Sequence, residues 1–312
     1  MAALSIKYMN LNFFSKKTDT LKKKIGIPRS FFYYFYPGLW ETYFSEIGFI
    51  PVLSKPSNLN TANRASIISE AEHCFPIKLF DAHAEELLDS VDILFIPRII
   101  SMKKDYITCP KFGALPDAAA ADVASDKPVL IIEINENKKP LKKTLFELGC
   151  DLKVPSLKVK KAIEKAYNRM YLERELLMKT KYKEDAPTFL ILGHPYILHD
   201  PFISGMIIKK LNELKVNIEI FSFSKEYSSE TNIMWCTSNK MYHKISTMEK
   251  SQYNGIIQIA AFNCGCDSMM IETFRPVINE KKIPYMVLII DEHSAQAGLD
   301  TRLEAFIDST GW

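Results

Sequence analysis

Short apolar runs alternate along this chain with longer amphipathic segments, and this alternation constrains the fold more than any other feature. Most of the runs are apolar throughout, as expected of strands that are covered on both faces of a parallel sheet. Alternating strands and helices require crossover connections, so the predicted fold class is α/β with mostly parallel sheets. The predicted strands are 24–28, 50–53, 93–97, 129–134, 188–193, 217–223, 255–262 and 285–291.

The segments between the strands predict helices and two separate halves. Residues 102–116 are expected to form a loop, and residues 138–183, rich in Lys, Glu and Leu, are expected to form long helices with a solvated charged face. The predicted helices are 39–47, 61–70, 76–88, 201–213, 233–250, 267–279 and 295–308. The predicted domains are an N-terminal extension at 1–23, a first α/β domain at 24–137, a helical connector at 138–185 and a second α/β domain at 186–312.

Composition excludes several classes of function. The 312 residues carry 40 Lys and Arg against 37 Asp and Glu, a balance that favours neither nucleic acid nor an anionic membrane as partner. There are only 11 glycines, and neither a dinucleotide-binding G-x-G-x-x-G after a strand nor a P-loop occurs. No apolar run approaches the ~20 residues that span a bilayer. The N-terminal residues lack the pattern of a signal peptide, so we expect a cytoplasmic protein.

Six cysteines in an expected reducing compartment point to metal binding, redox chemistry or inert burial rather than to disulfides. Because no C-x-x-C pair occurs, a zinc ribbon or a thioredoxin motif is disfavoured. Cys74 is followed two residues later by Pro76, which is typical of the first turn of a helix. A thiol at the positive end of a helix dipole favours the thiolate, which is the form that binds metal.

Cys109 and Cys264 follow predicted strands, at the sheet edge where open α/β folds bind ligands. We therefore expect Cys74, Cys109 and Cys264 to converge from loops of the two domains, with inert burial of each thiol as an equally weighted alternative. Cys150 and Cys236 are interpreted as inert thiols on helices.

Several motifs together resemble one protein family over residues 24–308. They are IGIPR at 25–29, CFPIK at 74–78, FIPR at 95–98, CPKF at 109–112, GHPY at 193–196, DPFI at 200–203 and DEHSA at 291–295. The chain resembles the acyl-CoA dehydratase activase-related proteins, which are kin to the 2-hydroxyacyl-CoA dehydratase subunits and the double-cubane-cluster proteins. The resemblance implies two Rossmann-like (flavodoxin-like) domains and an iron–sulfur cluster ligated by cysteines.

Cys74, Cys109 and Cys264 stand at the cysteine positions of that family. Three thiolates on a 4Fe–4S cluster, the form we expect, leave one iron open to water or substrate. Cys266 stands where the family has a proline, and it is either a fourth ligand or incidental; we favour incidental. A double cubane remains the alternative cluster, and it needs more than three thiolates.

Polar residues near the predicted strand ends complete the candidate site. His194 is expected either to donate to a cluster sulfide or to be a structural histidine. Glu292 and His293 are expected either to take part in acid–base chemistry or hydrogen bonding around a cluster, or to have a capping or structural role. We favour the capping or structural role. Arg29 and Arg98 are expected either to bind a phosphate of coenzyme A or a carboxylate of a partner, or to form ion pairs between the domains. We favour the ion pairs.

Three functions are compatible with these residues. The favoured one is an iron–sulfur protein that accepts low-potential electrons from an ATP-dependent activase, a partner that would hydrolyse the ATP for which this chain has no P-loop. The second is a catalytic dehydratase or reductase component that acts on a 2-hydroxyacyl-CoA or another small substrate at the open iron. The third is a binding module without a cluster. A second copy of the chain or a dehydratase-like subunit is the further expected partner; nucleic acid and membrane are not.

Overall fold

The computed structural model describes residues 23–123, 127–177, 183–223, 231–294 and 296–311, so the predicted extension at 1–23 lies almost wholly outside the described residues. Two compact units are present. The first comprises the described residues up to Lys55 together with Leu79–Glu175, and the second comprises Pro56–Lys78 together with the described residues from Leu176 onward. Each unit is built on a four-stranded parallel sheet, which confirms the α/β class and two Rossmann-like sheets.

The sheet of the first unit has the order β2-β1-β3-β5, and all its neighbouring strands are parallel. Its strands are β1 (Lys24–Ile27), β2 (Ile50–Leu53), β3 (Ile93–Phe95) and β5 (Val129–Leu130), and the short pair β4 (Arg98–Ser101) and β6 (Glu133–Asn135) follows β3 and β5. Predicted strand 129–134 is therefore split in two, and predicted strand 93–97 ends at Phe95, with β4 as an additional strand that the sequence did not predict. Pro97 lacks the N–H that an unbroken strand would donate, and Arg98 N resumes the pairing with a bond of 2.9 Å to Ile132 O.

An aromatic core fills the first unit. Helix α1 (Leu39–Ile47) buries Trp40 and Phe44, and the rings of both lie 4.8 Å from the ring of Phe95 on β3. The short 3₁₀ helix Phe31–Phe35 buries four of its five aromatic residues, so this aromatic run belongs to the core. Helices α5 (Leu141–Asp151) and α6 (Ser156–Leu177), in the predicted connector, group with this unit as far as Glu175.

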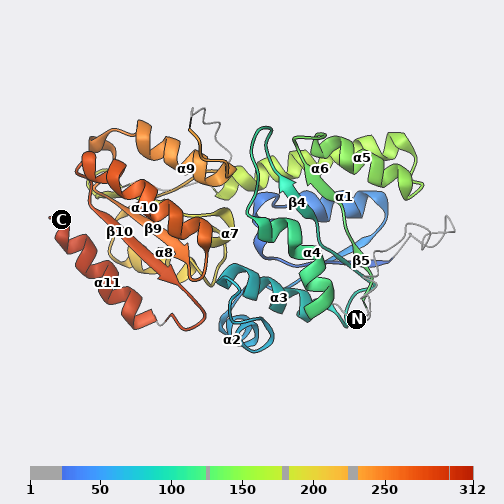
Figure 1. Cartoon of the computed structure of the whole chain (residues 1–312), viewed down its shortest axis with the longest axis horizontal. Coiled ribbons are helices and arrows are strands. Elements are labelled where there is room, and N and C mark those ends of the chain that lie inside the picture. The colour runs from blue at the N-terminus through green and yellow to red at the C-terminus, as the bar shows by residue number, and fades with distance from the viewer. Residues whose placement is uncertain (1–22, 124–126, 178–182, 224–230, 295, 312) are drawn as a thin grey trace. The chain divides into compact units, whose positions relative to one another are not determined.

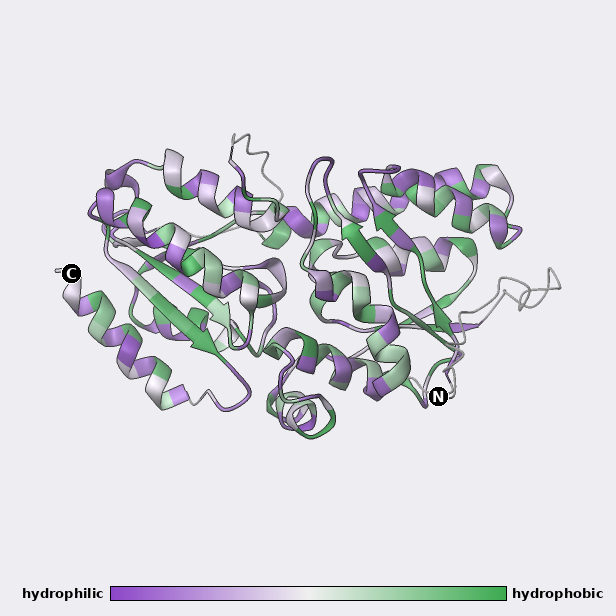
Figure 2. Cartoon of the chain, in the orientation of Figure 1, coloured by the Kyte–Doolittle hydropathy of each residue, from purple (hydrophilic) through white to green (hydrophobic). Residues whose placement is uncertain are grey.

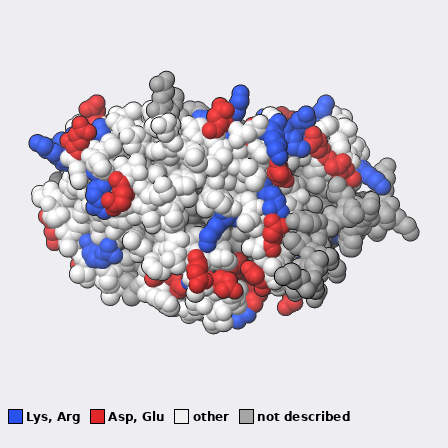
Figure 3. Space-filling model, viewed as in Figure 1, with Lys and Arg blue, Asp and Glu red and all other residues white. Residues whose placement is uncertain are grey.

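The charged face of α5 and α6 is solvated. In Figure 3 the Lys and Arg side chains of this region lie among Asp and Glu side chains. Several form ion pairs, among them Lys165 with Glu46 at 2.9 Å and Lys139 with Glu147. None of the helices in the described ranges combines the length and the apolar composition needed to cross a membrane.

Helix α4 (Pro110–Asp122) begins inside the segment 102–116 that the sequence predicted as a loop. Gly113 and Pro116 lie within this helix, although both residue types disfavour a helix interior. The helix forms nevertheless, because Pro110 occupies its first position and an alanine run supports its second half. The expectation of a loop through residue 116 was wrong from residue 110 onward.

The sheet of the second unit has the order β10-β9-β7-β8, again parallel throughout. Its strands are β7 (Thr188–Leu192), β8 (Asn217–Ile220), β9 (Gly255–Ala261) and β10 (Tyr285–Ile290). All seven residues of β9 are buried, and Figure 2 shows the strands as mainly hydrophobic. The chain moves from β7 outward to β8 and then returns to β9, so the order reverses between β7 and β9.

Helices cover both faces of this sheet. Helix α9 (Cys236–Thr247) packs with α10 (Gly265–Glu280), and α8 (Gly205–Glu213) packs with α11 (Gln296–Ser309) (Figure 1). Helix α2 (Leu59–Ile68), the start of α3 (Phe75–Leu87) and the one-turn α7 (Pro195–Leu198) complete the unit. The helix predicted at 201–213 starts only at Gly205. Before it, Asp200 Oδ1 caps a separate turn by accepting from the N–H groups of Phe202 and Ile203.

Gly149 lies where α5 and α6 approach each other closely. A Cβ at this position would lie 2.6 Å from both γ-carbons of Val159 and 3.2 Å from Tyr43 Oη. We expect Gly149→Ala to lower the free energy of unfolding by about 2 kcal/mol, because the overpacked helices must move apart. Urea unfolding measures this. Gly298→Ala is the matched control at an exposed position of α11, where an added Cβ meets nothing within 4 Å, and it should raise the free energy of unfolding by up to about 1 kcal/mol. Equal effects of both substitutions would contradict the close packing.

His83 on α3 is fully buried. Burial, with a smaller contribution from the positive charge of Arg29, lowers its pKa from 6.5 to about 4. Between these values the unfolded chain binds a proton that the folded chain does not, so stability falls as pH drops. We expect His83→Gln to reduce the loss of unfolding free energy between pH 7 and pH 5 by about 2 kcal/mol. Urea unfolding at both pH values tests this, and an unchanged difference would show that His83 does not stay neutral.

Candidate functional site

The three cysteines that the sequence singled out share one structural position: each directly precedes a helix. Cys74 precedes α3, Cys109 precedes α4 and Cys264 precedes α10. The carbonyl oxygen of each accepts a hydrogen bond from the first turn of its helix. Because the first backbone N–H groups of a helix carry partial positive charge, this position stabilises a thiolate relative to a thiol. The sequence predicted a helix N-terminus for Cys74 alone.

Cys264 is held in a tight turn between β9 and α10. The backbone N–H of Asp267 lies 3.5 Å from Cys264 Sγ and donates to it. Asp267 Oδ2 in turn accepts from the N–H of Ala261 at 2.9 Å, which ties the first turn of α10 to the end of β9. Asn263 has a φ of +59°, a left-handed conformation that Asn tolerates better than most residues. The thiol is almost completely buried, with Cys264 7% exposed.

The loop that carries Cys74 lies beside the loop that carries Cys264, within the second unit. The N–H of Phe75 donates to Phe262 O at 3.4 Å, and Asn263 Nδ2 donates to Ala71 O at 3.4 Å. Cys74 is 6% exposed. Two buried thiols at helix N-termini are thus carried by adjoining loops, although 190 residues of sequence separate them.

His194 adds an imidazole to this region. It directly precedes α7, and its ring stacks on that of Tyr196 at 5.0 Å. Its Nε2 lies 3.3 Å from Asp267 Oδ1, without the geometry of a hydrogen bond. Both side chains are buried, so His194 is linked to the Cys264 turn through Asp267. Sequence reasoning missed Asp267; the signal was an acidic residue in the first turn of a predicted helix, three residues after a cysteine.

A buried ion pair connects the first turn of α3, directly after Cys74, to the loop that follows β10. Lys78 lies one helical turn after Cys74, and its Nζ donates to Glu292 Oε1 at 2.6 Å, with both side chains 9% exposed. Glu292 is therefore engaged with α3, and His293 next to it is exposed. Asp291 caps this loop by accepting from His293 N and Ser294 Oγ. The sequence singled out Glu292 but not its partner Lys78.

The two arginines lie in the first unit. Arg98 binds both carboxylate oxygens of Asp117, at 2.7 and 2.9 Å, and also donates to Gly113 O. Because both partners lie on α4, Arg98 fixes the helix that begins at Cys109. The guanidinium of Arg29 lies 6.0 Å from the ring of Tyr33. The ion pair of Arg98 joins two elements of the same unit, not two domains.

The remaining cysteines differ in position. Cys150 is half-buried within α5, and Cys236 is the buried first residue of α9. Cys266 is the second residue of α10, and it is also buried. Cys74, Cys264 and Cys266 belong to the second unit, whereas Cys109 belongs to the first.

The donor set matches an iron–sulfur cluster in type, because thiolates are the ligands that such clusters use. Within the described residues, however, no group of three or more His, Cys, Asp or Glu side chains is arranged to hold a metal ion. The chemistry of Cys74, Cys109 and Cys264 therefore fits a cluster, and the assignment of one remains a proposal.

Residues 24–223 match the family described as CoA enzyme activase uncharacterised domain (DUF2229). This range is well over half of the chain. The chain belongs to this family. The activase-related match contains Cys74, Cys109 and His194, and it ends before Cys264, Cys266 and Glu292. No curated protein matches the sequence.

The Lys78–Glu292 pair provides a test of the Cys74 loop. Lys78→Met leaves the Glu292 carboxylate buried without its cation, so we expect a loss of about 3 kcal/mol in unfolding free energy. Adding Glu292→Gln should recover at least about 1 kcal/mol, because the uncompensated charge is removed. Chemical denaturation of the variants measures both values.

The matched control for this pair is Lys165→Met. It breaks the exposed pair with Glu46 and should cost less than about 1 kcal/mol. A double variant that is no more stable than Lys78→Met would contradict the account of a buried charge pair.

Proposed function

We propose that this activase-related protein is an iron–sulfur protein that accepts low-potential electrons from an ATP-dependent activase. The observation that carries the proposal is the shared position of Cys74, Cys109 and Cys264, each directly before a helix. The cluster that we propose is 4Fe–4S, which would transfer one electron at a time when bound. Membership of a CoA enzyme activase family supports the choice of partner.

The residues around the thiols have roles that follow from their contacts. The helix N-termini stabilise the three thiolates and any further negative charge at the site. The N–H of Asp267 donates to Cys264 Sγ, and donors to ligating sulfur raise the potential of an iron–sulfur centre. His194 and Lys78 are positioning residues, since each acts through Asp267 or Glu292 rather than on a thiol.

The partner supplies the ATP chemistry in this proposal. The sequence has neither a P-loop nor a dinucleotide fingerprint, so an ATP-dependent step is assigned to the activase. A second copy of this chain or a dehydratase-like subunit is proposed as a further partner.

A second candidate function is catalysis on a 2-hydroxyacyl-CoA or a small related substrate. The observation that favours it is the number of proposed ligands, since three thiolates leave one iron of a 4Fe–4S cluster open. The contacts of Arg98 weigh against it, because its guanidinium already binds Asp117 and Gly113 and offers little to a coenzyme A phosphate.

Anaerobic purification with iron and sulfide analysis tests the cluster directly. We expect a brown protein with about four irons and four sulfides per chain. Serine substitutions at Cys74, Cys109 or Cys264 should each remove most of the iron, while Cys150→Ser and the buried control Cys236→Ser should retain it. Cys266→Ser should retain it as well, and a loss there would assign a fourth ligand.

Two outcomes separate the candidate functions. Oxidation of a reduced activase by the loaded protein, without product from added acyl-CoA compounds, supports the electron carrier, whereas product formation supports the enzyme. A colourless wild-type protein, with the three substituted variants folding as it does, would contradict both and leave a binding module.

A further inference from the structure

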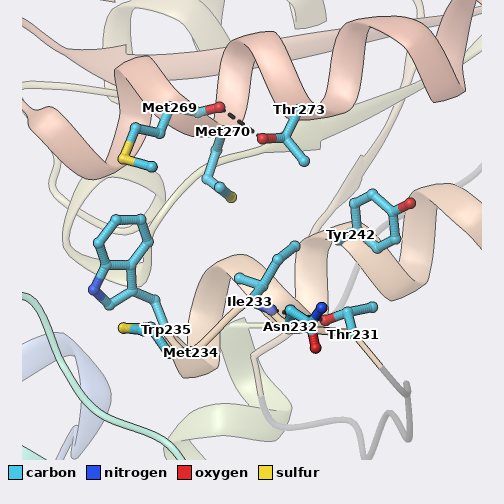
Figure 4. A pocket seen from close by; sticks show the side chains of 9 residues that line it. All are labelled: Thr231, Asn232, Ile233, Met234, Trp235, Tyr242, Met269, Met270 and Thr273. Atoms are coloured by element: carbon cyan, nitrogen blue, oxygen red, sulfur yellow. Dashed lines mark hydrogen bonds between the residues drawn. The ribbon is translucent and has the colours of Figure 1, made fainter.

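The second unit contains a cavity of about 800 Å³ between α10 and the segment that leads into α9 (Figure 4). Ile233, Met234 and Trp235 form one wall just before α9 begins, and Met269 and Met270 form the opposite wall on α10. Tyr242 of α9 lies at one end of it (Figure 4). The volume lies within the range of about 300–1,000 Å³ that is typical of small-molecule sites.

The walls of the cavity are built from aromatic rings and thioethers. Figure 4 shows Met269 and Met270 facing Trp235 and Ile233 across the opening. Met270 is buried at the base, whereas Met234 and Met269 are 56% and 58% exposed at the mouth. Thioethers make favourable contacts with ring systems and adapt to their shape. Indole and phenol rings add stacking or edge-on contacts to a planar ligand.

Two threonines, Asn232, Trp235 and Tyr242 supply the polar side-chain groups of the lining, and the hydroxyls of both threonines are hydrogen-bonded. Thr273 Oγ1 donates to Met269 O at 2.8 Å, and Thr231 Oγ1 accepts from the N–H of Ile233 at 3.3 Å and from Asn239. Among the described residues that line the cavity, none is charged. Asn232 is exposed at the rim and offers an amide. A charged ligand would lose hydration here without gaining an ionic partner among these described residues, which therefore favour an uncharged one.

We propose that this cavity binds an uncharged aromatic small molecule or ring, held between the thioethers of α10 and the indole of Trp235. One polar substituent of the ligand would be placed to meet Asn232 at the rim. The inference does not rest on the proposed cluster, because none of the lining residues is a proposed ligand. It adds a binding site to the second unit, on the helix that begins directly after Cys264.

The test uses N-phenyl-1-naphthylamine, an uncharged aromatic dye that fluoresces on entering an apolar site. We expect saturable binding with one site per chain of the full-length protein. Thr273→Trp fills the cavity, and Met269→Lys places a charge at its mouth without disturbing the core. Each should weaken binding at least about tenfold. The dye is excited directly, so that the added tryptophan does not contribute to its signal.

Thr301→Trp is the matched control. Thr301 is an exposed residue of α11 and, like Thr273, donates to the carbonyl four residues before it. The Thr301→Trp variant should bind the dye with the affinity of the wild type. Competition by n-decanol, an alkyl alcohol, should be at least about tenfold weaker than competition by 1-naphthol. Non-saturable dye binding, unchanged affinity in both cavity variants, or equal competition by the two alcohols would overturn the proposal.

Discussion

Parallel strands place their carboxyl ends, and the N-termini of the helices that follow, at the same edge of a sheet, and the candidate site depends on this constraint. Strand β9 is buried along its whole length, so its end cannot move without breaking the core of the second unit. Cys264 is therefore fixed in space by a strand on one side and by α10 on the other. A cysteine in that turn lies against backbone N–H groups irrespective of its chemical role.

Much of the fold could be predicted from hydrophobic periodicity, because strands covered on both faces are apolar throughout. Strand β2 and helix α1 have the predicted bounds, and the other main strands differ by a few residues. Several of the misses involve proline. Pro97 was read as the last residue of a strand that ends at Phe95. Pro110 was read as a loop residue, although it starts α4, and Pro201 was read as a helix start, although it lies in a turn before α8. A proline indicates that a helix begins or ends nearby, but it does not indicate whether the helix precedes or follows the proline.

The site could be predicted only where a local pattern indicates it. Cys74 was placed at a helix N-terminus because Pro76 follows it, and that signal lies within three residues. Lys78 and Asp267 were missed, since their importance comes from partners that are distant in the sequence: Glu292 is 214 residues from Lys78, and His194 lies on another loop. Such pairs arise from tertiary packing, which no local propensity reports.

The assignment of Pro56–Lys78 to the second unit has a consequence for synthesis of the chain. This segment leaves the ribosome long before the strands of its own unit are synthesised. Its apolar side chains therefore lack their partners while Leu79–Glu175, the rest of the first unit, is being synthesised. The contacts of Ser57 with Asp200, of Phe75 with Phe262 and of Lys78 with Glu292 form only when the later strands arrive. The Cys74 loop is thus among the first parts of the second unit to be synthesised and among the last to be enclosed.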